Sequence, residues 1–220
     1  MSVAQRLFSG SRAPAKMPTP GPHPLPPARV FRRRLPLRVT AQSWFRLHAF
    51  SYGAIYWGLD PPRPEPFRFD APAHEFGILY AGEDPHCAFI ETFGHNTGAT
   101  RRISAVDLAS RALSRIDVAR PVRLVDLTGP NAAVIGVDAR LYAGEYKVSQ
   151  HWSLAFHQHR DAPDGIYYPS RHDSDRCCVA LFDRVADAVT AVALPLLTEP
   201  SQRHLLADIV RRYRFAVHGL

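Results

Sequence analysis

The stretch FGILYAGEDPHCAFIETFGH, residues 76–95, decides the fold of this chain. Its first part, FGILYAG, is a short apolar run with glycine near both ends, which is typical of a buried strand. Asp84 then provides a helix N-cap and Pro85 suits the first helical position, so a helix is expected to begin there and to continue through Phe93. The segment therefore predicts a buried strand that runs directly into a short helix carrying a single acid, Glu91.

Strands and helices alternate on both sides of this segment. Further strands are predicted at SWFRLHAF (43–50), ISAVDLA (103–109), VRLVDLTG (122–129), GIYYPS (165–170), CCVALFDR (177–184) and RFAVHGL (214–220). Helices are predicted at 132–144, with Asn131 as the cap, at 147–159 and near 205–213, and residues 51–75, with five prolines, are predicted to be an irregular loop. Many short strands among modest helices indicate an α+β fold rather than a regular βαβ series.

The charge of the chain is concentrated at its start. The net charge is +7 over 220 residues, yet residues 1–40 hold eight basic residues and no acid, which leaves 19 basic and 20 acidic groups beyond them. The same 40 residues hold eight of the 20 prolines, which remove backbone donors and disfavour helix. We therefore expect a disordered, basic, proline-rich leader at 1–40 and one folded domain at 41–220. The alternative is an arm that touches nucleic acid or a partner through FRRR at 31–34.

The amino-acid sequence also indicates the compartment in which the protein works and whether it binds a metal ion. No apolar stretch approaches the roughly 20 residues that a membrane span needs, and no signal-peptide core is present. The three cysteines cannot all pair and none lies in a CxxC arrangement, so we expect a cytoplasmic protein whose cysteines in RCCVALF are buried thiols. The histidines of 151–159 are spaced by six and two residues, unlike the i, i+4 pair that places two ligands on one helix face, so no metal site is expected.

Four side chains suit a ligand that carries phosphates, a ring and a developing positive charge. Arg46 and Arg68 lie amid apolar residues, in FRL and FRF, and a guanidinium in a semi-buried cleft binds phosphate oxygens in bidentate fashion. Tyr80, at the end of the buried strand, offers a ring face and a hydroxyl. Glu91 offers a fixed anion. The ordinary alternatives are surface arginines, a core tyrosine and a glutamate on a solvated helix face.

Ser170 ends the GIYYP strand and can bind or orient a ligand, or cap the following RHDSD turn. A Ser–His–Asp triad made of Ser170, His172 and Asp173 fails on spacing, because neighbours on one turn seldom form the required chain of hydrogen bonds. A binding or orienting role is therefore expected for Ser170, not that of a nucleophile.

These segments resemble the RES domain family. The resemblance rests on FRLH with Arg46, RFD with Arg68, ILYAGEDPHCAFIET with Tyr80 and Glu91, and DGIYYPSRHD with Ser170, and it covers about residues 43–185. The family is named for an arginine, a glutamate and a serine, which Arg68, Glu91 and Ser170 match. Many members have a glycine-rich, GGRWN-like segment around the second arginine, whereas this chain has EPFRFD.

The resemblance implies an ADP-ribosyltransferase-like fold, in which a split and mainly antiparallel β core surrounds a cleft for NAD⁺. Family members are toxins of bacterial toxin–antitoxin pairs that deplete NAD⁺, some with water and some with phosphate as co-substrate. NAD⁺ is then a substrate, and no cofactor is expected. Their antitoxins are typically Xre-like proteins that block the cleft and that alone contact DNA, and the toxin can form a homo-oligomer or a hetero-oligomer with its antitoxin.

The resemblance also implies roles for the five residues. Glu91 would face the scissile ribose as the main catalytic group, with Arg68 and Tyr80 assisting. Arg46 and Arg68 would bind the pyrophosphate, Tyr80 would stack on nicotinamide, and Ser170 would contact the ribose or the amide. Two alternatives stay open: a protein ADP-ribosyltransferase, and a non-enzymatic nucleic-acid-binding component that acts through residues 1–40.

Overall fold

The structure, a computed structural model, describes residues 21–59, 65–95 and 101–219. Eight strands form one sheet in the order β1-β6-β7-β8-β3-β2-β5-β9, and β10 pairs with β4 in a second sheet. The strands are β1 (Leu37–Thr40), β2 (Trp44–Ala49), β3 (Ile78–Gly82), β4 (Arg101–Ser104), β5 (Arg111–Val118), β6 (Val122–Asp126), β7 (Gly165–Pro169), β8 (Cys177–Phe182), β9 (Val189–Ala193) and β10 (Phe215–His218). The mixture of a large sheet with short helices confirms the predicted α+β class.

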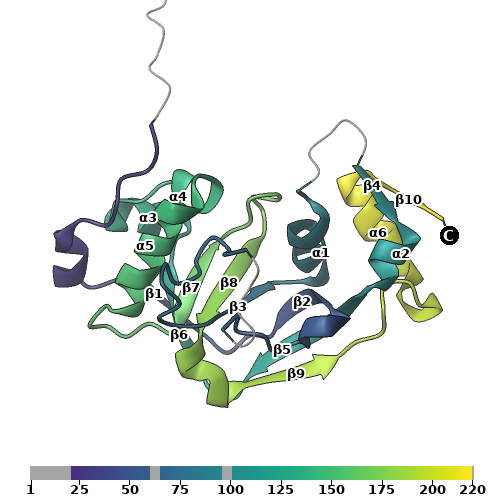
Figure 1. The fold of residues 1–220 in the computed structure, drawn as a ribbon, viewed down its shortest axis with the longest axis horizontal. Helices are drawn as coiled ribbons and strands as arrows, with labels where there is room; N and C mark the ends of the chain where they lie inside the picture. Colours follow the sequence, from purple (N-terminus) through teal and green to yellow (C-terminus); the bar gives the residue numbers. More distant parts are fainter. Residues whose placement is uncertain (1–20, 60–64, 96–100, 220) are drawn as a thin grey trace, which may run out of the picture.

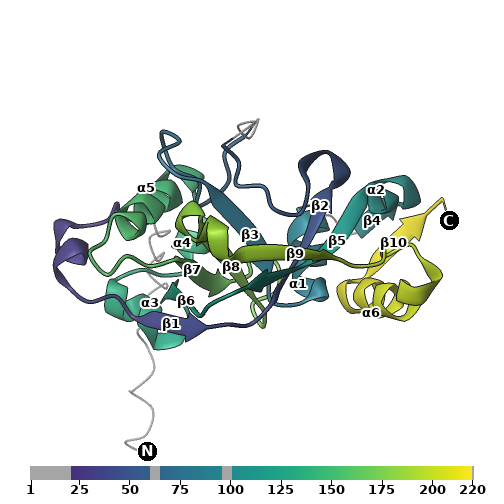
Figure 2. The ribbon, with the colours of Figure 1, turned by 90° about the horizontal axis from the view of Figure 1, so that it is seen from below.

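The helices lie in two groups on opposite sides of the molecule, and α1 is the helix nearest its middle (Figures 1 and 2). One group is α3 (Gly129–Ile135), α4 (Arg140–Ala143) and α5 (Tyr146–His157), and the other is α1 (Pro85–Phe93), α2 (Ala105–Ala109) and α6 (Arg203–Tyr213). Single 3₁₀ turns occur at Ala28–Arg32, Phe50–Tyr52, Asp183–Ala188 and Pro200–Gln202. Each helix group has its own apolar core, with Trp152 and Phe156 of α5 in one and Phe89 of α1 and Ile209 of α6 in the other.

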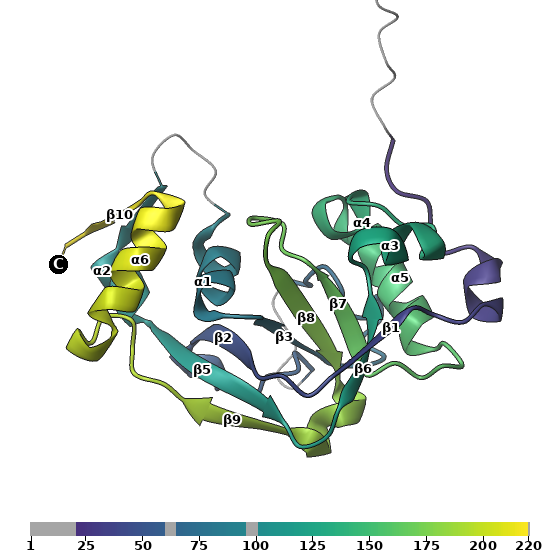
Figure 3. The same cartoon turned by 180° about the vertical axis from the view of Figure 1, so that it is seen from behind.

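The large sheet is mainly antiparallel and is split near its centre. Only β6 and β7 are parallel among its described pairs. Strands β2 and β3 are joined there by a single described pair, Phe45 with Gly82, whereas β2 pairs with β5 along its whole length. The side chain of Arg46 bridges the split, since its Nη1 donates to the carbonyl oxygen of Tyr80 at 2.8 Å. Figure 3 shows α1 over the place where β2 and β3 meet.

Helix α1 begins as the sequence predicts. The Asp84 carboxylate accepts a hydrogen bond from the backbone nitrogen of Cys87 at 2.7 Å, and Pro85 occupies the first turn. A Cβ at Gly82 would lie 2.7 Å from the Cβ of Cys87, so a glycine is needed for α1 to lie this close to β3. The short connection fixes the position of Glu91 relative to the split in the sheet.

Most predicted elements are confirmed, and two are wrong. The predicted strand at 103–109 is wrong, because β4 ends at Ser104 and the next five residues form α2, whose N-cap is the Ser104 hydroxyl bonded to the nitrogen of Asp107 at 2.9 Å. The continuous helix predicted at 132–144 is also wrong, because Gly136 ends α3 in the left-handed region with φ of 87°. Strands β1, β5 and β9 were not predicted.

The interpretation of residues 1–40 as a disordered leader is wrong for residues 21–40. Val30 and Leu35 are buried in the core that holds α5, and β1 pairs with β6. The indole nitrogen of Trp152 donates to the carbonyl oxygen of Pro24 at 2.8 Å. The predicted boundary at residue 41 is therefore too late, because a prolyl segment can still pack through its carbonyls and its few apolar side chains. Residues 1–20 lie outside the described residues.

Over the described ranges, no helix is long and apolar enough to cross a membrane. The same ranges contain no group of three or more His, Cys, Asp or Glu side chains placed to hold a metal ion. Cys177 and Cys178 belong to β8. Cys178 is buried as predicted, whereas Cys177 is only partly buried. The sulfur of Cys178 lies 3.5 Å from that of Cys87 without a disulfide.

Candidate active site

A cavity of about 600 Å³ opens where β2 and β3 separate. Arg46 reaches it from β2, Tyr80 from β3, Glu91 from α1 and Arg68 from the loop before β3. The structure therefore brings four of the five predicted site residues to one cavity. The fifth, Ser170, follows β7, is only 3% exposed and contacts Glu91 instead of lining the cavity.

The Ser170 hydroxyl holds the Glu91 carboxylate. Ser170 Oγ donates to Glu91 Oε1 at 2.5 Å, and it accepts hydrogen bonds from the backbone nitrogens of His172 and Asp173, both at 3.1 Å. Because two backbone N–H groups donate to the lone pairs of Ser170 Oγ, the hydroxyl proton of Ser170 points at the Glu91 carboxylate. A short bond to an ionised acceptor is among the stronger hydrogen bonds in proteins. His172 and Asp173 contact Ser170 through their backbone nitrogens, and no described hydrogen bond joins the Ser170 hydroxyl to the His172 ring.

Arg68 is nearly buried, with 8% of its surface exposed. Its Nη1 donates to the carbonyl oxygen of Gly144 at 2.7 Å, and its guanidinium carbon lies 4.5 Å from the centroid of the Tyr146 ring. Burial lowers the pKa of Arg68, but a guanidinium remains charged at neutral pH. A cation removed from water in this way attracts an anionic ligand more strongly than a surface arginine does.

Tyr80 fixes the loop that carries Arg68. Its hydroxyl donates to Asp70 Oδ1 at 3.0 Å and accepts from the backbone nitrogen of Phe69 at 2.8 Å. Its ring packs edge-on against Phe67, with the centroids 5.7 Å apart. The EPFRFD segment, which departs from the family pattern, is thus tied to β3 by the tyrosine itself. The hydroxyl is already engaged within the protein, and the predicted stacking of the ring on nicotinamide stays a prediction.

The cavity also contains residues that the sequence analysis did not single out. Tyr52 and Tyr56 stack with ring centroids 4.6 Å apart, and Arg111, Arg171 and His95 line the walls. Four arginines and two glutamates lie among the lining residues, so the cavity suits an anionic ligand. Arg171 directly follows Ser170 in the motif and could have been found there. The two tyrosines lie in the loop at 51–75, whose sequence gives no periodic signal.

His172 and His95 meet edge to face beside Glu91, with ring centroids 5.0 Å apart. Burial lowers the pKa of His172, and the nearby His95, Arg171 and Arg101 add to that effect, while the Glu91 carboxylate opposes it. The His172 ring is therefore neutral at pH 7, and the charge of Glu91 is not compensated by this neighbour.

Comparison with known proteins identifies the family of the chain. The RES domain model matches residues 35–205, which is more than half of the chain. Among solved structures, the fold is similar to a chain in the crystal structure of the M. tuberculosis MbcT–MbcA toxin–antitoxin complex, with a TM-score of 0.56 and 16% sequence identity over 78% of this chain and 92% of that one. No curated protein matches the sequence. The chain belongs to the RES domain family.

Proposed function

We propose that this protein is the toxin of a bacterial type II toxin–antitoxin system and depletes NAD⁺ by cleaving its nicotinamide–ribose bond. The observation that carries the proposal is the cavity at the split of the sheet, where Glu91 shares one space with Arg46, Arg68 and Tyr80 in a RES domain. The RES domain, matched over residues 35–205, would be the catalytic unit.

The chemistry requires a fixed anion close to the ribose. As the bond to nicotinamide breaks, positive charge develops on the ribose ring and its oxygen, while nicotinamide leaves as a neutral molecule. A preorganised carboxylate stabilises that charge, as in glycoside cleavage. Glu91 would fill this role, and the hydrogen bond from Ser170 would hold its carboxylate in place before the substrate binds.

The arginines would bind the diphosphate of NAD⁺. Arg68 carries five N–H donors in a planar fork, and the bond to Gly144 uses one of them. Arg46, anchored across the split by Tyr80, would contribute a second positive charge. Tyr80 would contact the nicotinamide end through its ring. Either water or inorganic phosphate would attack the ribose, so the activity is that of an NAD⁺ glycohydrolase or an NAD⁺ phosphorylase.

A cognate antitoxin is the proposed partner. The structural neighbour comes from a toxin–antitoxin complex, which supports an antitoxin partner for this chain. We propose that this partner covers the cavity. We propose an Xre-like antitoxin with its own DNA-binding part, so that this chain would reach DNA only indirectly.

The deciding experiment incubates the purified, antitoxin-free protein with NAD⁺, with and without phosphate, and follows released nicotinamide. The proposal predicts turnover in at least one condition, with ADP-ribose as the product from water and phosphorylated ADP-ribose as the product from phosphate. No turnover by folded protein in either condition would reject it. Label transferred from NAD⁺ to a protein would instead indicate an ADP-ribosyltransferase.

Truncation tests part of the third possibility, a non-enzymatic nucleic-acid-binding component that acts through residues 1–40. A variant that lacks residues 1–20 keeps every described contact and removes part of the basic leader. The proposal predicts unchanged nicotinamide release by this variant. A function that required nucleic-acid binding through these residues would be lost.

A further inference from the structure

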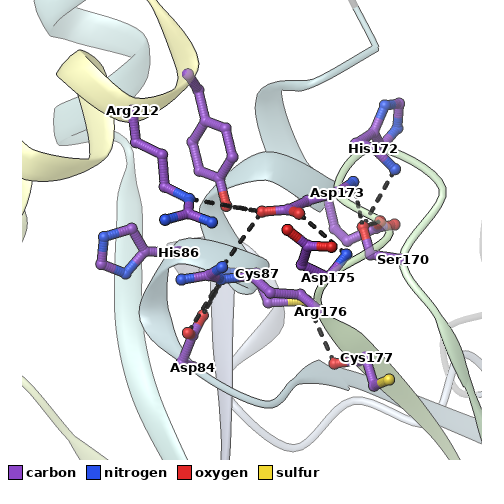
Figure 4. A network of polar contacts seen from close by, with 12 residues as sticks. Asp84, His86, Cys87, Ser170, His172, Asp173, Asp175, Arg176, Cys177 and Arg212 are labelled. Atoms are coloured by element: carbon purple, nitrogen blue, oxygen red, sulfur yellow. Dashed lines mark hydrogen bonds and ion pairs between the residues drawn. The ribbon is translucent and has the colours of Figure 1, made fainter.

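The turn that holds Ser170 is fastened to the C-terminal helix. Residues 170–176 connect β7 to β8, and their contacts continue to α6 through the Asp173 carboxylate (Figure 4). Tyr213, the last residue of α6, donates its hydroxyl to Asp173 Oδ2 at 2.7 Å. The backbone nitrogen of Asp173 donates to Ser170 Oγ, which in turn donates to Glu91. One chain of hydrogen bonds thus joins α6 to the proposed catalytic acid.

The Asp173 carboxylate is the centre of this network. It is 11% exposed, and Arg176 and Arg212 approach Oδ2 at 3.3 Å and 3.7 Å. Its Oδ1 accepts from the backbone nitrogen of Asp175 at 3.2 Å. Burial alone would raise the pKa of Asp173, but the hydrogen bond from Tyr213 and the two arginines outweigh it and the pKa is lowered. Asp173 therefore remains an acceptor for Tyr213 at neutral pH.

The helix that carries Glu91 is tied to the same turn. Arg176 bonds to Asp84 at 3.0 Å, and Asp84 is the N-cap of α1. Figure 4 shows Arg176 between Asp84 and Asp173. Both partners of the Glu91–Ser170 bond are thus positioned by one cluster, on one side through the turn and on the other through the start of α1. Tyr213 and Arg212, both from α6, are the members of this cluster that lie outside the RES match, which ends at residue 205.

We propose that Tyr213 is a positioning residue for the reaction: by binding Asp173 it holds the Ser170 turn where Ser170 can orient the Glu91 carboxylate. This inference rests on the proposed NAD⁺ cleavage. Tyr213 does not line the cavity, so it acts only through the turn. Loss of its hydroxyl would allow the turn to move by a fraction of an ångström, and displacements of about 1 Å at a catalytic group can cost about 100-fold in rate.

The test compares Tyr213→Phe with Asp208→Asn. Tyr213→Phe removes one oxygen and keeps the ring of this buried residue in the apolar core that contains α6. Asp208→Asn disturbs a different link between α6 and α1, the 2.9 Å contact of Asp208 with His86, and leaves the turn untouched. We expect Tyr213→Phe to lower kcat for nicotinamide release about tenfold with KM changed less than about twofold. Asp208→Asn is expected to keep the wild-type kcat.

A double variant then asks whether Tyr213 acts through Ser170. Ser170→Ala is expected to lower kcat more than Tyr213→Phe does. In the Ser170→Ala background, Tyr213→Phe should cost nothing further, because residues of one network are not additive. Losses that multiply, a wild-type kcat in Tyr213→Phe, or an equal loss in Asp208→Asn would each overturn the proposal.

Amide hydrogen exchange measures the positioning role of Tyr213 without relying on enzyme activity. The amides of His172 and Asp173 donate to Ser170, so they should exchange faster in Tyr213→Phe than in the wild type or in Asp208→Asn. Unchanged exchange at these two amides would overturn the positioning role. If the wild-type protein releases no nicotinamide, the proposed function fails by itself, and the exchange rates still decide whether Tyr213 holds the turn.

Discussion

Glu91 and Arg68 line the same cavity, but they are held there by different kinds of contact. Arg68 is fixed by the backbone carbonyl of Gly144 and the ring of Tyr146. Glu91 is fixed by the side chain of Ser170, whose own position depends on backbone donors of the next turn. The arginine is therefore held directly by one main-chain carbonyl and one aromatic ring, whereas the acid is held by a series of polar contacts that reaches the C-terminal helix.

The different ways in which Arg68 and Glu91 are held match two different roles, substrate binding for Arg68 and catalysis of bond cleavage for Glu91. A guanidinium needs only to be present and partly desolvated to attract a diphosphate, and a carbonyl acceptor is enough to orient it. A carboxylate that stabilises a transition state needs a fixed position, because only interactions that strengthen at the transition state raise kcat. We therefore expect substitutions near Arg68 to change KM, and substitutions that loosen Glu91 to change kcat.

The largest effect is expected for Glu91→Gln. The amide keeps the size of the side chain and removes the charge opposite the developing positive ribose. Nicotinamide release should fall about 100-fold to 1,000-fold, with little change in KM. Steady-state kinetics with purified protein measures it, and an unchanged thermal midpoint serves as the control for folding. Full activity in this variant would remove Glu91 from the chemistry.

Arg68→Lys is expected to have the next largest effect, chiefly on KM. Lysine keeps the positive charge but cannot form the planar bidentate contact or the same stacking on Tyr146. KM for NAD⁺ should rise about tenfold while kcat falls less, as initial rates over a range of NAD⁺ concentrations would reveal. A loss confined to kcat would contradict the assignment of Arg68 to binding.

Tyr80→Phe should affect stability more than activity. The variant keeps the ring but removes the partner of Asp70 and of the Phe69 nitrogen, and Phe69 is fully buried. Losing that partner should cost about 1–2 kcal/mol in the free energy of unfolding, measured with urea. Activity at low temperature should fall less than about threefold, whereas a loss as large as that of Glu91→Gln would mean that the hydroxyl takes part in the reaction.

The smallest effect concerns a residue away from the cavity. His157 stacks on Phe76 with ring centroids 4.0 Å apart, and burial together with Arg184 lowers the pKa of this histidine to about 4. The unfolded chain takes up this proton near pH 6.5 and the folded chain only near pH 4, so stability is complete above pH 6.5 and declines as the pH falls towards 4. Because the ring is half-buried, we expect a loss of about 1 kcal/mol between pH 7 and pH 5.

His157→Phe should abolish that loss, and urea unfolding at the two pH values measures it. Glu91→Gln and Arg68→Lys should lower activity by the same factor whether they are made in the wild type or in His157→Phe. An equal loss of stability at pH 5 in wild type and His157→Phe would contradict the assignment.

The sequence predicts the strand and the helix around Glu91 because their signals are local. The apolar run of β3, the Asp84 cap and the following proline all lie within a few residues of each other. The same local logic identifies α2, where Ser104 and Asp107 have the spacing of a helix cap, but the apolar residues of ISAVDLA favour a strand equally well. Strand β5 was missed because charged residues at 111, 115 and 117 interrupt its apolar positions.

The contacts that complete the site could not be predicted in this way. Ser170 and Glu91 are 79 residues apart in the chain, and nothing in either neighbourhood indicates that their side chains meet. The same is true of Tyr213 and Asp173, and of Arg68 and Gly144. The motif residues indicate the kind of reaction. The tertiary fold determines which of them line the cavity and which, like Ser170, hold another site residue in place.

The most direct test of the central claim is a crystal structure of the Glu91→Gln variant with NAD⁺ bound. We expect the nicotinamide ribose to lie within hydrogen-bond distance of residue 91, the diphosphate to contact Arg46 and Arg68, and Ser170 still to contact residue 91. A diphosphate bound away from both arginines, or a ribose on another wall of the cavity, would contradict it.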